Sequence, residues 1–124
     1  MYAAGADFSN KNFNNLNLQN AIFDKTDLRN TSFTNAQIDG ARFTFANLDN
    51  SNLFERNNFS GINLAGVKFP ENSLKGKDLS GANLSHVDLT KQDLSDTNLQ
   101  EATLSYVKFP ENSLKGKDLS GANL

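Results

Sequence analysis

Large apolar side chains stand at every fifth position along almost the whole chain. The series begins with ten such centres, namely Phe8, Phe13, Leu18, Phe23, Leu28, Phe33, Ile38, Phe43, Leu48 and Leu53. After a slip of one residue within 54–58, fourteen more follow: Phe59, Leu64, Phe69, Leu74, Leu79, Leu84, Leu89, Leu94, Leu99, Leu104, Phe109, Leu114, Leu119 and Leu124. A period of five fits neither an α-helix, with about 3.6 residues per turn, nor a long strand with its period of two. It fits short extended segments separated by turns, with the centres forming the structural core of an all-β solenoid.

A second period of twenty residues is carried by the turns. Asn10, Asn30 and Asn50 are twenty residues apart, and Gly61 and Gly81 keep the same spacing after the slip. Asn and Gly suit turns because they tolerate positive φ. Twenty residues are four pentapeptides, so we expect coils with four sides. The twenty-four centres then predict about six coils in a single domain covering residues 1–124.

The inward position two residues before each centre is often alanine but has polar exceptions. These are Lys11, Asn72, Lys77, Gln92, Asn112 and Lys117. An unpaired lysine ammonium is costly to bury. We therefore expect these side chains to reach past the wall into solvent or to distort the coil locally.

Several repeats resemble the A-(N/D)-L-x-x motif of the pentapeptide-repeat family. The matching segments are Ala6-Asp7-Phe8, Ala46-Asn47-Leu48, Ala82-Asn83-Leu84 and Ala122-Asn123-Leu124. The resemblance covers essentially the whole chain and implies a right-handed quadrilateral β-helix. It also implies two kinds of role. Some family members resemble a DNA rod and bind DNA gyrase, and related segments serve as rigid domains of bacterial secreted effectors.

One block of eighteen residues occurs twice. Residues 67–84 are repeated without change as 107–124, at an offset of forty residues or two predicted coils. Natural duplication and deliberate engineering both explain this repeat. The chain also stops on a repeat centre with no capping helix, although solenoids need polar caps. We therefore expect a fragment, an engineered solenoid, or a protein that stacks end to end.

Nothing in the sequence indicates catalysis, a cofactor or a metal site. His86 is the only histidine, there is no cysteine, and no nucleophile is paired with a base. Calcium-binding β-rolls need paired glycines in a longer repeat, which this chain lacks. We expect a protein that is not an enzyme and has no cofactor.

Charge and hydropathy limit which partners and which cellular location the sequence favours. Twelve basic and fourteen acidic residues give a net charge of −2, which does not favour nucleic acid as a partner. The sequence has no apolar run long enough to span a membrane and no signal-peptide pattern at its first residues. We expect a cytoplasmic protein, with secretion as part of a larger effector left open.

A candidate partner surface lies along one corner of the predicted solenoid. Two residues past the fourth-side centres the chain places Lys25, Phe45, Gly66, His86 and Tyr106. Three of these are aromatic or imidazole rings that should point outward, and exposed aromatic side chains mark partner sites in many proteins. Phe54, next to the slip, should project elsewhere on the surface. The alternative is that all four are isolated surface residues without a role.

The function we expect is that of a non-catalytic scaffold. It would act by protein–protein contact, by end-to-end self-association, or as a spacer. The alternative is a DNA mimic that binds gyrase or another topoisomerase, although Lys68 and Lys108 interrupt the outward column of Asp7, Asp27 and Asp88. A third class is an accessory domain of an enzyme whose catalytic part lies elsewhere.

Overall fold

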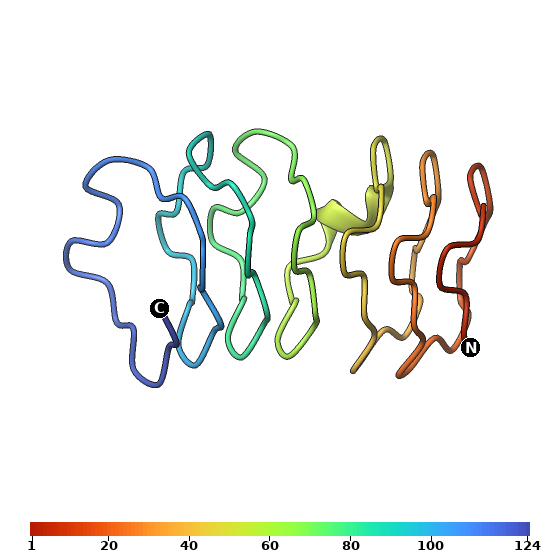
Figure 1. The fold of residues 1–124 in the computed structure, drawn as a ribbon, viewed down its shortest axis with the longest axis horizontal. Helices are drawn as coiled ribbons and strands as arrows, with labels where there is room; N and C mark the ends of the chain where they lie inside the picture. The colour runs from red at the N-terminus through yellow and green to blue at the C-terminus, as the bar shows by residue number, and fades with distance from the viewer.

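The computed structural model describes residues 1–124, and the chain winds through them as a stack of coils. The N-terminal coil lies at one end of the rod and the C-terminal coil at the other (Figure 1). Isolated parallel bridges join residues twenty positions apart, such as Tyr2 with Ile22 and Asp7 with Asp27. The one regular element is a short 3-10 helix, η1, over Asn52–Glu55. No helix is long and apolar enough to cross a bilayer.

Most pentapeptides combine a one-residue bridge with a tight turn. At the first side, Phe8 N–H donates to Asp27 O of the next coil at 2.8 Å, and Asp27 N–H donates back to Ala6 O at 2.9 Å. Lys11 N–H then closes a turn on Phe8 O at 3.2 Å, and Asn10 takes φ 65°. A positive φ at the third residue is what a type II turn requires, so Asn and Gly recur there.

The core consists of columns of centres that stack from coil to coil. In the N-terminal half these centres are mostly phenylalanines. The Phe13 and Phe33 rings stack at 5.1 Å, the Phe23 and Phe43 rings stack at 5.3 Å, and neighbouring columns meet edge to face. Burial of each such side chain contributes about 1.5–3 kcal/mol. Since the contacts run between adjacent coils, stability is of nearest-neighbour character.

Some centres near the two ends of the rod are less buried than the sequence predicts. Leu124 is 67% exposed, so its assignment to the core is wrong. The four others that retain intermediate exposure are Phe8, Phe109, Leu114 and Leu119. Phe109, Leu114 and Leu119 lie in a segment, 109–119, that no backbone hydrogen bond joins to the coil before it, so their side chains pack less closely. Phe8 and Leu124 have a neighbouring coil on one side only in this structure.

The register slip is taken up by η1. Ser51 caps this helix, its Oγ accepting from Leu53 N–H at 3.1 Å. The bridge between Arg42 and Asn63, which spans the helix, joins residues 21 apart instead of twenty. The tight helical turn accommodates the extra residue, and the coils resume their stacking after it.

The prediction that Phe54 belongs to a partner surface is wrong. The side chain is buried at 7% exposure, and its ring lies 5.3 Å from that of Phe69. The 3-10 turn rotates two consecutive apolar side chains, Leu53 and Phe54, toward the core. An extended backbone would have sent one of them outward.

The inward polar side chains bind backbone carbonyls of neighbouring coils. The ammonium of Lys77 donates to Phe54 O and lies 5.7 Å from the ring centroid of Phe59, and its partial burial lowers its pKa. Gln92 is buried, donating from Nε2 to Pro70 O at 2.7 Å and accepting from Ser73 N–H at 2.9 Å. Pairing of this kind removes most of the cost of burying a polar group.

The duplicated block distorts the coil at its prolines. After Pro70 the positive φ moves one residue later than in a regular repeat, to Asn72 at 54°. After Pro110 it moves in the same way to Asn112 at 60°. These two asparagines are exposed corner residues and do not point inward, while Lys11 is exposed as expected. Of the polar residues expected at inward positions, some therefore lie where the coil is distorted and others pair with backbone carbonyls.

Candidate functional site

The corner column predicted from the sequence lies at turn positions with left-handed backbone. Its members have φ values of 56° at Lys25, 55° at Phe45, 69° at Gly66, 66° at His86 and 60° at Tyr106. This conformation costs most L-residues about 1–2 kcal/mol, whereas Gly is indifferent to it and Asn tolerates it. Phe and Tyr are therefore unfavourable choices for these corners.

The three rings are arranged in one exposed row along the rod. His86 and Tyr106 stack face to face with centroids 4.9 Å apart and an interplanar angle of 5°. Phe45 follows at 6.1 Å from His86, tilted by 38°. Its ring lies over Gly66, where a Cβ would overlap the ring carbons. Glycine at this corner thus makes room for Phe45 to approach His86.

The row is largely open to solvent. Phe45 is 53% exposed, Tyr106 is 81% exposed, and His86 is also exposed. Burial of these rings therefore stabilises the fold little, although their stacking against one another adds some stability. The structure thus places the three predicted surface residues together, and it adds the mutual stacking that the sequence did not reveal. The one signal from which it could have been expected is that His86 and Tyr106 lie twenty residues, or one coil, apart.

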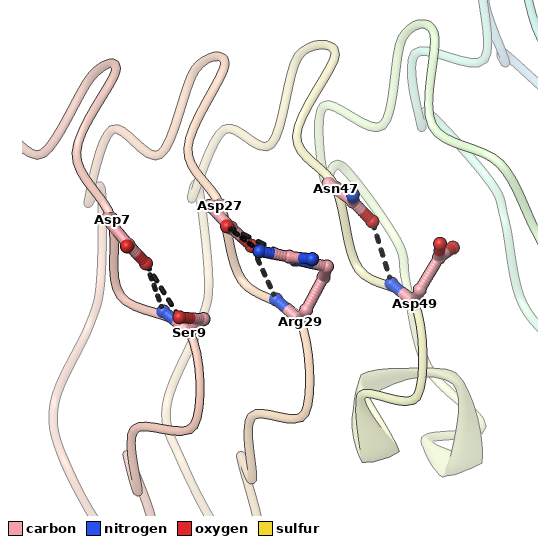
Figure 2. A network of polar contacts seen from close by, with 6 residues as sticks. All are labelled: Asp7, Ser9, Asp27, Arg29, Asn47 and Asp49. Carbon is pink, nitrogen blue, oxygen red and sulfur yellow. Dashed lines mark hydrogen bonds and ion pairs between the residues drawn. The ribbon is translucent and has the colours of Figure 1, made fainter.

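The outward carboxylates and amides of the sides have a local structural task. Figure 2 shows Asp7, Asp27 and Asn47 on successive coils, each accepting from a backbone N–H two residues later. These bonds measure 3.0 Å for Asp7, 3.2 Å for Asp27 and 3.1 Å for Asn47. Such Asx contacts hold the chain at the start of each turn.

The aspartates of this column also accept from the side chain two residues later, which lowers their pKa. The donor is the Ser9 hydroxyl for Asp7, the Arg29 guanidinium for Asp27, and the Thr90 hydroxyl for Asp88. Arg29 also neutralises Asp27 through an ion pair at 2.7 Å. This side of the rod is therefore not a continuous negative stripe, because Arg29 neutralises Asp27, Asn47 is uncharged, and Lys68 and Lys108 interrupt the column.

The residues of the structure do not assemble into a metal-binding cluster. No group of three or more His, Cys, Asp or Glu side chains lies close enough to hold an ion. His86 has rings on both sides, with Phe45 toward one end and Tyr106 toward the other. What this arrangement offers chemically is a narrow apolar ridge with one imidazole in its middle.

Comparison with known proteins agrees with the repeat. A family model described as a pentapeptide repeat region matches residues 4–79, and a model of eight pentapeptide repeats matches residues 78–111. No curated protein matches the chain.

Two solved structures of QnrB1, a plasmid-mediated fluoroquinolone resistance protein, are similar in fold. The full-length protein has a TM-score of 0.62 at 20% identity, covering 95% of this chain and 60% of its own. A trypsin-treated variant has a TM-score of 0.58 at 18% identity, covering 99% and 59%. The chain thus spans about three-fifths of their length. The likeness shows a right-handed β-helix.

Proposed function

This chain belongs to the pentapeptide-repeat family, and we propose that it is a non-catalytic β-helical scaffold that binds another protein. The scaffold has six coils of four pentapeptides, which the twenty-residue separation of its bridged positions supports. A non-catalytic role is supported by the surroundings of His86, the only histidine, which stacks between two rings in an exposed row.

The observation that carries the proposal is the exposed row of Phe45, His86 and Tyr106. Each residue takes a backbone conformation that costs about 1–2 kcal/mol for a side chain of its type. Burial and stacking of the rings offset that cost only about evenly, and the turn itself does not call for a ring, since Gly or Asn would satisfy it. Strained, exposed aromatic residues are typical of functional positions. We infer that the row inserts into an apolar groove of a protein partner.

Site-specific photocrosslinking tests the ridge. Benzoyl-phenylalanine placed at position 106 should crosslink a discrete partner in an extract of the source cells. The same probe at Asn35, an exposed corner with φ 58° on another column, is the matched control. Excess unlabelled protein should compete, whereas the triple variant Phe45→Asn, His86→Asn, Tyr106→Asn should not. Equal competition by the triple variant would contradict the proposal.

The partner is a different protein or a second copy of this chain. Light scattering over a concentration series distinguishes these cases. A mass that stays monomeric supports a foreign partner. A mass that rises with concentration, and returns to the monomer in the triple variant, assigns the ridge to self-association.

The second candidate is a topoisomerase-directed DNA mimic. It is favoured by the rod shape (Figure 1) and by the outward carboxylates of Asp7, Asp27 and Asp88. It is weakened by Lys68 and Lys108 in the same column and by the Arg29 ion pair. Purified gyrase in a supercoiling assay separates the two candidates. If the chain inhibits gyrase, and the inhibition is lost when the three aspartates are replaced but kept in the triple ridge variant, the chain is a DNA mimic and our proposal is wrong.

A further inference from the structure

A groove opens between two coils within the second copy of the duplicated block. The backbone ladder runs as far as Leu89 N–H to Lys108 O at 2.8 Å and resumes with Glu101 N–H to Ser120 O at 2.7 Å. No backbone hydrogen bond joins residues 109–119 to the coil before them. The last coil is displaced from its neighbour there (Figure 1). A space of about 720 Å³ separates residues 92–98 from residues 110–118.

A lysine side chain crosses this groove. Lys117 Nζ donates to Leu94 O at 2.5 Å and to Thr97 O at 3.3 Å. Lys77, the same residue of the first copy, donates in the same way to Phe54 O, which also lies 23 residues before it. The lysine therefore takes the place of backbone donors wherever the block leaves the ladder.

The other edge of the same coil shows what the groove can bind. There the first copy of the block pairs with residues 91–98 through Gly76 N–H to Ser95 O at 2.9 Å and Leu79 N–H to Asn98 O at 2.9 Å. Asn98 N–H donates in turn to Lys77 O at 3.0 Å. Twenty residues later, the groups equivalent to Gly76 N–H, Leu79 N–H and Lys77 O are Asp96 N–H, Leu99 N–H and Thr97 O. Neither of these two N–H groups has a backbone partner.

The charge of the lining indicates what kind of segment would fit. Four carboxylates and two ammonium groups line the groove: Asp93, Asp96, Glu111, Asp118, Lys115 and Lys117. An excess of negative charge raises the local concentration of a cationic ligand. A ligand that also carries an extended backbone would satisfy the unpaired ladder groups.

We propose that this groove binds an extended basic peptide segment, which adds to the edge of residues 92–98 as a strand. Its carbonyls accept from Asp96 N–H and Leu99 N–H, its N–H donates to Thr97 O, and its lysine or arginine side chains face the carboxylates. Lys117 competes with the peptide and leaves the groove when it binds. The site is independent of the aromatic ridge and does not rest on the function proposed for it.

The test uses a labelled synthetic octapeptide of alternating lysine and threonine, with binding followed by fluorescence anisotropy. Lys117→Met should tighten binding about tenfold, because it removes a competing donor and a repelling charge. Lys77→Met, the matched change in the first copy, should leave affinity unchanged. A peptide with N-methylated backbone, and one with glutamate for lysine, should each bind about tenfold more weakly.

Amide hydrogen exchange at saturating peptide provides a direct readout. Asp96 and Leu99 amides should become protected, while the corresponding amides of other coils keep their rates. Equal binding of the N-methylated peptide, or unchanged exchange at both amides, would overturn the proposal and reduce the interaction to unspecific attraction between charges. The Phe45→Asn, His86→Asn, Tyr106→Asn variant should bind the octapeptide normally, which separates this site from the ridge.

Discussion

Replacement of Tyr106 by asparagine tests whether the aromatic ridge serves binding or the stability of the fold. If the ring is kept for binding, the folded chain loses little when it is removed. Asparagine is the right replacement because it tolerates the φ of 60° at this corner, as other corners of the rod show. The same change at Phe45 repeats the experiment at the other end of the row.

The expected effect follows from three terms. Only about a fifth of the Tyr106 surface is covered, so lost burial amounts to about 0.3–0.6 kcal/mol. The stack on His86 contributes about 0.5–1.5 kcal/mol. Against these, asparagine relieves most of a backbone cost of about 1–2 kcal/mol. The sum lies within about 1 kcal/mol of zero.

Urea denaturation followed by far-UV circular dichroism measures this balance, with Phe43→Ala as the comparison. Phe43 is fully buried, so its loss should cost about 3–5 kcal/mol. An unchanged m-value shows that the denaturation midpoints report stability. If Tyr106→Asn instead costs more than about 2 kcal/mol, the ring is structural and the functional interpretation of the ridge fails.

Three other changes test the architecture. Gly66→Ala should cost more than Gly61→Ala, by about 1 kcal/mol, since both have positive φ but only the first Cβ overlaps the Phe45 ring; equal losses in thermal denaturation would contradict that packing. Phe23→Ala should cost about 3–5 kcal/mol in urea, because the ring is fully buried and stacked, and a loss below 1 kcal/mol would show that the column does not hold the rod together. The pKa of Asp88 is lowered in the folded state, so its contribution to stability is present above the unfolded pKa and is lost as pH falls through the folded one; Asp88→Asn should flatten the loss of stability below about pH 4, and an unchanged acid limb would argue against the Thr90 contact.

The sequence predicts the rod because its signal is repeated. Every coil restates the same alternation of inward centre, outward polar residue and turn, so one irregular pentapeptide does not hide the period. The stacking of the columns, such as Phe13 on Phe33, follows from that period alone.

The sequence does not predict the local structure at positions where the repeat is interrupted. Whether the extra residue near Phe54 would bulge outward or form a 3-10 turn depends on the packing of Phe69, a contact between coils with no pattern in the sequence. The pairing of Lys77 and Lys117 with carbonyls was equally hidden, because it depends on how far the coils lie apart where the backbone ladder is interrupted. The stack of His86 on Tyr106 follows from spacing, but its coplanarity does not.

At the corners of this rod, a side chain can change to bind a partner with the least effect on folding. On the sides, a residue such as Asp27 already serves the turn through its own side chain, so replacing it removes an Asx contact. At a corner the backbone demands only a left-handed conformation, and the side chain points away from the core. A ring placed there costs only the local backbone strain. It fits against the neighbouring coil when the matching corner is a glycine, as Gly66 is beside Phe45, or another ring, as Tyr106 is beside His86. A pentapeptide solenoid can therefore acquire a binding ridge one corner at a time, each step trading about 1–2 kcal/mol of backbone strain for exposed contact surface.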